Sequence, residues 1–153
     1  MTLLAIISTV LFTGCSETEK DSGEEQQIEP FVPTEGDWDL LSSPGENDCD
    51  FTDDESSVAV LTAIDGGFTF LVDKEAAEGD PVPTFTCTLR DMSFTCAQYS
   101  AQESEGGNTF TQVIDFSGSF ADENTMTGEA SLSMSFGTQS CSGIVNLSAT
   151  TIP

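Results

Sequence analysis

The sequence has no histidine and almost no basic residues, which excludes several classes of function. Only Lys20, Lys74 and Arg90 are basic among 153 residues, against 27 acidic residues, so the formal net charge is -24 at pH 7. Proteins bind the phosphates of nucleic acids through clustered Lys and Arg, so we expect no nucleic-acid partner. Without histidine, the chain has neither histidine acid–base chemistry nor a His-ligated zinc site.

The chain does contain enough apolar residues to fold. Hydrophobic residues make up 37% of the sequence and include eleven Phe, which is too apolar for a wholly disordered acidic chain. The length is that of one domain with appendages. We therefore expect a single folded domain.

The first fourteen residues have the pattern of a signal peptide. Residues 1–14 carry no charged side chain, and Leu3–Phe12 is almost wholly apolar. This stretch is shorter than the roughly 20 residues that cross a bilayer, but it has the length of a signal-peptide core. It ends in residues 11–15 (LFTGC), which resemble the lipobox of bacterial lipoproteins. The resemblance implies that Cys15 is lipidated, and that Ser16 directs the protein to the outer membrane of a Gram-negative cell; a secretory signal with an unrelated cysteine is the competing interpretation.

An acidic segment follows, and in this interpretation residues 15–35 form a lipidated tether. Residues 16–35 contain seven acidic side chains, one Lys and two Pro. Such a segment buries too little apolar surface to offset the entropy lost on ordering. We expect a flexible spacer between the membrane and the domain, with Phe31 and Val32 either docked on the domain or free.

From residue 36 to residue 153 the chain alternates polar and apolar residues with the period of half-buried β-strands. Asp65-Gly66 and Asp91-Met92 each separate two such runs and predict hairpins. The pattern predicts an all-β domain, an antiparallel meander of about eight strands that closes into an up-and-down barrel. A β-sandwich is the alternative.

The first of these runs opens with Gly36-Asp37-Trp38, which resembles the G-x-W motif of lipocalins and related calycins. The resemblance implies a β-barrel and, as an alternative function, binding of a small apolar ligand. The residues expected to face inward are bulky, which favours a filled core over a ligand cavity. They are Trp38, Phe68, Phe70, Phe85, Phe94, Phe110 and Phe116.

Four cysteines remain once Cys15 is assigned to lipidation: Cys49, Cys87, Cys96 and Cys141. An even number of cysteines in an exported chain indicates two disulfides. The spacings contain no C-x₂-C pair and therefore disfavour a zinc site.

The hairpin at Asp91-Met92 predicts how these cysteines pair. With a two-residue loop, Cys87 lies opposite Cys96 in a non-hydrogen-bonded pair, where the Cα atoms are close enough for a disulfide. Cys49 then bonds to Cys141. The pairing of Cys49 with Cys87 and of Cys96 with Cys141 stays open if the turn is longer.

The faces of the last three strands predict their register. Apolar residues occupy even positions up to Phe120, even positions again from Met126, and odd positions from Cys141. Opposed residues share a face, so the first connection has an odd length and the second an even length. We expect Phe120 to pair with Met126, and Phe136 with Cys141 across residues 137–140.

Residues 46–55 hold six carboxylates, and carboxylate oxygens are the ligands that Ca²⁺ prefers. An EF-hand loop starting at Asp48 fails, because its Gly position is Asp53 and its last position is Ala59. We interpret the segment as a solvated acidic loop and assign no metal and no cofactor.

No arrangement of residues predicts catalysis. The nucleophiles have no histidine base, and no G-x-S-x-G motif is present. The protein is therefore not expected to be an enzyme. The leading hypothesis is a surface-anchored lipoprotein that acts as a structural or interaction module, with the membrane and a protein or small apolar ligand as its partners.

Overall fold

The computed structural model describes residues 30–77, 82–105 and 108–153. The predicted signal peptide (residues 1–14), Cys15, Ser16 and most of the predicted tether lie outside these residues. Within them, every regular element is a β-strand, so the all-β prediction is confirmed.

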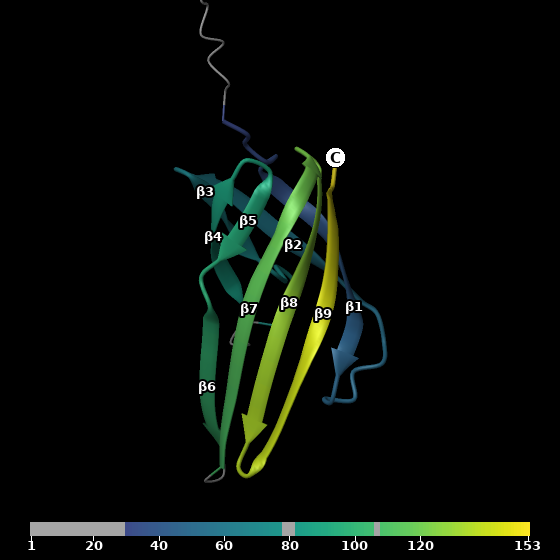
Figure 1. The fold of residues 1–153 in the computed structure, drawn as a ribbon, viewed down its shortest axis with the longest axis vertical. Coiled ribbons are helices and arrows are strands. Elements are labelled where there is room, and N and C mark those ends of the chain that lie inside the picture. Colours follow the sequence, from purple (N-terminus) through teal and green to yellow (C-terminus); the bar gives the residue numbers. More distant parts are fainter. Residues whose placement is uncertain (1–29, 78–81, 106–107) are drawn as a thin grey trace, which may run out of the picture.

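Nine antiparallel strands follow one another along the chain. They are β1 (Gly36–Asn47), β2 (Glu55–Ile64), β3 (Gly67–Leu71), β4 (Thr84–Arg90), β5 (Ser93–Cys96), β6 (Tyr99–Glu105), β7 (Asn108–Asp122), β8 (Thr125–Phe136) and β9 (Gln139–Thr151). The sheet order is β5-β4-β3-β2-β1-β9-β8-β7-β6, and β5 also pairs with β7. That pairing closes an eight-stranded barrel with β6 as an extra strand (Figure 1). The predicted up-and-down barrel is therefore confirmed, and the β-sandwich alternative is wrong.

Strand β6 is the element that the sequence pattern did not separate from β5. The pattern predicts one strand over residues 93–99, but β5 ends at Cys96 and β6 begins at Tyr99. Between them the Ala97 N–H donates to the Thr86 carbonyl. The chain then leaves β4 and continues along the lower half of β7 alone (Figure 1).

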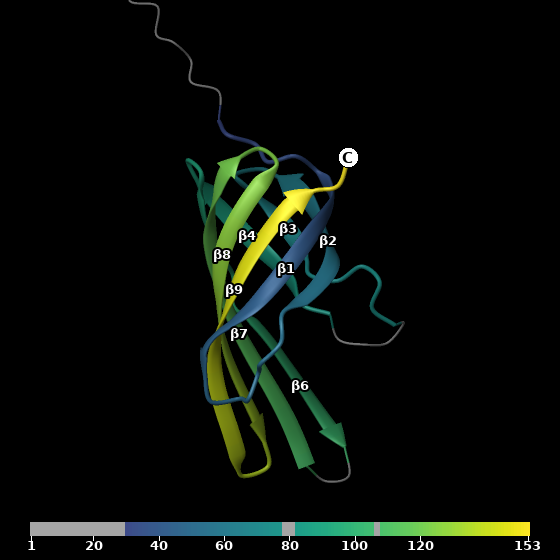
Figure 2. The same ribbon diagram turned by 90° about the vertical axis from the view of Figure 1, so that its right-hand side faces the viewer.

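Aromatic side chains fill the top half of the barrel, meaning the end where residues 30–35 and 151–153 lie in Figures 1 and 2. Trp38, Phe68 and Phe70 have no exposed surface. The Phe94 ring centroid lies 5.1 Å from that of Phe116 and 5.2 Å from that of Phe68, with edge-on geometry that favours aromatic pairs. Of the seven side chains expected inside, six are buried; Phe110, near the bottom end, is partly exposed.

The register of β7 with β8 up to Phe120 is the predicted one, but the predicted odd-length connection is wrong. The strands are joined by the two-residue turn Glu123-Asn124, and an irregularity between Phe120 and Asp122 accounts for the extra residue. Phe120 pairs with Met126, and Gly118 pairs with Gly128. The two glycines face each other because the rings of Phe94 and Phe116 occupy the space that their side chains would need: a Cβ on Gly118 would lie 2.7 Å from the Phe94 ring.

The predicted register of β8 with β9 is wrong by two residues. Phe136 pairs with Gln139, and Cys141 pairs with Met134. The connection is the two-residue turn Gly137-Thr138, in which Gly137 has a φ of 60°. Two-residue hairpin turns need such left-handed residues, which glycine supplies without steric cost. A shift of two residues leaves every side chain on its predicted face.

Substitution at Gly137 tests this turn. Gly137→Val is expected to lower the free energy of unfolding by about 1–2 kcal/mol, because a left-handed backbone disfavours residues with a Cβ. Gly137→Asn is the matched control and should cost less, since Asn tolerates this conformation. Urea denaturation of both variants measures the difference, and equal losses would contradict the two-residue turn.

Candidate functional site

The last residues of the predicted tether pack on the top end of the barrel. The Phe31 ring centroid lies 5.3 Å from that of Phe120. The indole Nε1–H of Trp38 donates to the Thr34 carbonyl at 3.1 Å. The sequence left open whether Phe31 docks, and the structure places it on the barrel.

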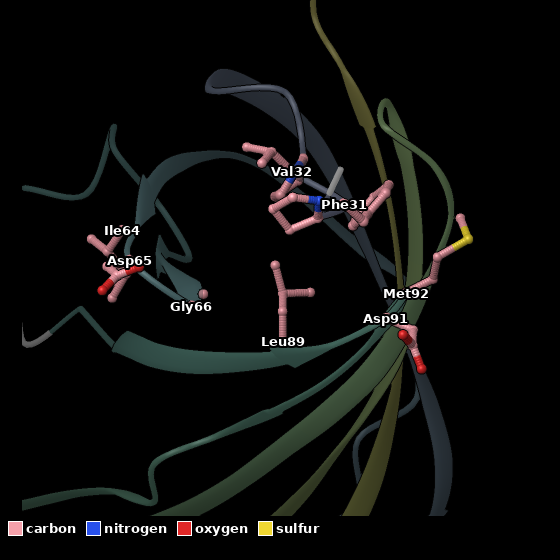
Figure 3. Close-up of a pocket in the computed structure, with 11 residues that line it drawn as sticks. Phe31, Val32, Ile64, Asp65, Gly66, Leu89, Asp91 and Met92 are labelled. Atoms are coloured by element: carbon pink, nitrogen blue, oxygen red, sulfur yellow. The ribbon is translucent and has the colours of Figure 1, made fainter. Parts of the chain in front are cut away.

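A pocket of about 580 Å³ lies between this segment and the turns that follow β2 and β4. Figure 3 shows Leu89 pointing toward Phe31 and Val32, with Ile64 at the end of β2 and Met92 in the turn after β4. Val32 is 55% exposed and Ile64 is 44% exposed. The apolar surface at the top therefore surrounds the place where the N-terminal chain joins the barrel.

At the bottom end, β6–β9 continue past the other strands and leave part of their inner face uncovered (Figures 1 and 2). Strand pairing and the alternation of faces determine which residues this inner face presents. They are Ala101 and Glu103 of β6; Phe110 and Gln112 of β7; Leu132, Met134 and Phe136 of β8; and Cys141, Gly143 and Val145 of β9.

Two pockets, of about 450 Å³ and 670 Å³, lie along this inner face. Both are lined by Asp50 and Met134, so together they form one groove, which we call the bottom groove. Its floor holds the apolar side chains of Phe110, Leu132 and Met134 beside the polar Gln112, and Phe136 at its outer end is 49% exposed. The groove is thus the place where the barrel interior opens to solvent.

The loop between β1 and β2 forms the opposite wall of the bottom groove. The Cys49–Cys141 disulfide ties this loop to β9, with 5.0 Å between the Cα atoms. The Asn47 side chain accepts from the Phe51 N–H at 3.0 Å and donates to the Phe51 carbonyl at 3.2 Å. Phe51 packs against the core, so the wall is held in place by covalent, polar and apolar contacts.

The rim of the groove is negatively charged. Asp50, Asp53 and Glu55 line it with exposed carboxylates, and Glu103 lies on the inner face of β6. No Lys or Arg lines either pocket. Lys74 forms its ion pair with Asp37, away from the groove. The groove therefore combines a cluster of apolar side chains with carboxylates that have no basic partner among its lining residues.

The structure also places the residues considered for calcium. In the described part of the chain, one group of three potential ligands gathers, comprising Asp48, Cys49 and Cys141. The two sulfurs are bonded to each other, so they are not the thiolates that bind metals. The Asp48 carboxylate accepts the Ser142 N–H, and the six carboxylate side chains of residues 46–55 are exposed. This geometry fits the interpretation as a solvated acidic loop.

Both predicted disulfides are present. Cys87 bonds to Cys96 across the β4–β5 hairpin, with 3.8 Å between the Cα atoms, and Cys49 bonds to Cys141. The register that predicted the first bond is also observed. The alternative connectivity is therefore wrong.

In the described residues, no helix has the length and apolar character needed to cross a membrane. Comparison of the chain with protein-family models, curated proteins and solved structures finds no match. The likeness to lipoproteins therefore depends on residues 11–15, and the likeness to lipocalins depends on residues 36–38 and on the barrel architecture.

Proposed function

We propose that the protein is a lipid-anchored interaction module of the outer membrane of a Gram-negative bacterium, and that it binds its partner in the bottom groove. The lipobox-like residues 11–15 support the anchor. The two disulfides support a location outside the cytoplasm, because disulfides persist in oxidising compartments.

The main support for this proposal is the position of the groove relative to the N-terminal segment. Residues 30–35 lie at the top of the barrel, and the β8–β9 turn lies at the bottom (Figure 2). Thr138 of this turn and the adjoining Phe136 and Gln139 line the groove. A chain anchored at Cys15 would thus be attached at the end of the barrel opposite the groove, which leaves the groove accessible to a partner. Because residues 30–35 pack on the barrel, fourteen residues (16–29) are left as the proposed spacer, and a flexible chain of that length spans an r.m.s. distance of roughly 20 Å.

A lipocalin-like carrier is the second candidate. The two groove pockets, at about 450 Å³ and 670 Å³, fall within the size range of small-molecule sites. The packed rings in the top half favour a ligand held at the open end over one enclosed in the barrel. Both candidates are binding functions, and neither requires catalysis.

Replacing the predicted lipidation site tests the anchor. Cys15→Ser in the full chain is expected to abolish fatty-acid labelling and to release the protein from the membrane fraction, because stable anchoring requires acyl chains. Ser16→Ala is the matched control and should keep the label. Persistent labelling of Cys15→Ser would contradict the anchor.

Position-specific photo-crosslinking in intact cells tests the groove. A benzophenone side chain at position 136 is expected to give a protein adduct, because Phe136 is half-exposed on the groove floor. The same group at position 131, on the outer face of β8, should give none. A small-molecule adduct at position 136 would support the carrier instead, and equal adducts at both positions would contradict a groove partner.

A further inference from the structure

We infer that the bottom groove takes an extended segment of a partner protein, rich in basic and apolar residues, which adds as a strand to the free edge of β6. The inference rests on the proposed function, since it names the partner chemistry of the same groove. Three features carry it: the edge of β6, the inner face beside that edge, and the charge.

The first feature is the edge of β6. This strand pairs with β7 from Tyr99 to Glu105 and ends the strand order of the sheet. Within the described residues, no strand pairs with its other edge. An unpaired edge presents a row of N–H and C=O groups, which an extended peptide can pair with in β-augmentation. These main-chain groups favour a polypeptide over a small amphiphile.

The second feature is the inner face beside that edge. Side chains of a strand alternate between its two faces, so every second residue of an added strand faces the groove. These residues would lie next to Ala101, whose small side chain leaves space, with Gln112 and then Met134 beyond it, and next to Glu103, with Phe110 beyond it. Apolar residues at some of these groove-facing positions would cover the surface that Phe110 and Met134 leave partly exposed, and a basic residue at another of them would lie beside Glu103.

The third feature is the charge. Glu103 lies on the inner face of β6, directly opposite Phe110, and Asp50 and Asp53 lie on the facing wall. Complementary charge steers association and selects the partner. A basic segment therefore fits this surface. A second copy of this chain does not, because pairing of two β6 edges would bring two Glu103 side chains and two proteins of net charge -24 together.

The probe is a synthetic peptide of about nine residues whose alternate positions, those that share one face of the added strand, carry Lys, Val and Phe, with Thr at the positions between them. It is titrated calorimetrically into the full chain carrying Cys15→Ser. We expect binding that weakens about tenfold in Glu103→Lys, because like charges juxtaposed at an interface are strongly unfavourable. Glu129→Lys is the matched control on the outer face of β8 and should weaken binding much less. Thermal unfolding of both variants verifies that each is folded.

Peptide N-methylation tests the strand pairing itself. One isomer is methylated at odd residues and the other at even residues, which removes the N–H donors of one peptide edge at a time. Addition to a single edge predicts that only one isomer loses binding. Binding of both isomers, equal weakening by the two charge variants, or a dimer that forms through β6 in sedimentation experiments would each overturn the inference.

The outcomes also separate this inference from the proposed function. A protein adduct at position 136 without binding of the alternating peptide overturns the strand-addition inference alone. Absence of both the protein adduct at position 136 and binding of the peptide would contradict the groove as the interaction site. Displacement of the peptide by dodecyltrimethylammonium, together with binding of both methylated isomers, assigns the groove to a cationic small molecule and overturns the inference.

Discussion

Replacing Cys49 and Cys141 together by alanine is expected to lower the free energy of unfolding by about 4–5 kcal/mol, more than removal of the other disulfide. This bond joins residues 92 apart in the sequence, and a disulfide stabilises by restricting the unfolded chain, more strongly for a longer loop. Cys87 and Cys96 are only 9 residues apart, so their joint replacement should cost about 2–3 kcal/mol.

Urea denaturation of the two double variants measures both effects on the same scale. Each variant keeps the other disulfide and therefore serves as its control. The order of the two losses is the decisive result. A larger loss from the Cys87–Cys96 pair, which is the more deeply buried, would show that core packing outweighs loop closure in this barrel.

The second large effect is expected from Phe116→Ala, which should lower the free energy of unfolding by about 3–5 kcal/mol. Phe116 is 2% exposed, and its ring centroid lies 5.1 Å from that of Phe94 and 5.3 Å from that of Phe85. Its removal leaves a cavity that neighbouring rings, fixed by their own contacts, fill only in part.

Phe136→Ala is the matched control for that substitution. Phe136 is 49% exposed on the groove floor, so its truncation should cost less than about 1 kcal/mol. Thermal or urea unfolding of the two variants measures the difference. Similar losses would contradict a barrel that is packed at the top and open at the bottom.

The sequence predicts much of this fold because local turn chemistry and strand periodicity agree. Asp65-Gly66 and Asp91-Met92 form the expected hairpins. The second hairpin also brings Cys87 opposite Cys96. Where alternation is strong on both partners, as for Phe120 and Met126, the register follows as well.

The predictions that were wrong or missing concern segments in which the alternation of polar and apolar residues gives no information. A register shift of two residues keeps each side chain on its face, so the pattern alone could not choose between a four-residue loop and the turn at Gly137-Thr138. Residues 100–105 (SAQESE) are mostly polar, so β6 had no apolar period to mark it. These residues form a strand because they pair with β7, which their own sequence pattern does not predict.

The bottom groove could not be predicted for a related reason. It exists because β6–β9 extend further than β1–β5, and strand ends are set by tertiary contacts that single-strand patterns do not define. The disulfide that holds its wall was predicted, but by elimination from the hairpin pair. The role inferred for Glu103 depends on its position beside Phe110, which no local motif indicates.

Three methionines in the described residues report on the three regions of the barrel. Met92 lines the top pocket, Met126 is 1% exposed in the filled core, and Met134 lies on the groove floor. Labelled methionine methyl groups, assigned by single Met→Leu variants, give one NMR signal from each region.

Titration of the peptide that carries Lys, Val and Phe on one face into the full chain carrying Cys15→Ser, monitored through these methyl signals, tests most directly whether the bottom groove is the binding surface. The account predicts a saturable shift of the Met134 signal while the Met92 and Met126 signals stay in place. A shift confined to Met92 would place binding at the top pocket, and saturable binding without any shift of Met134 would contradict a partner in the groove.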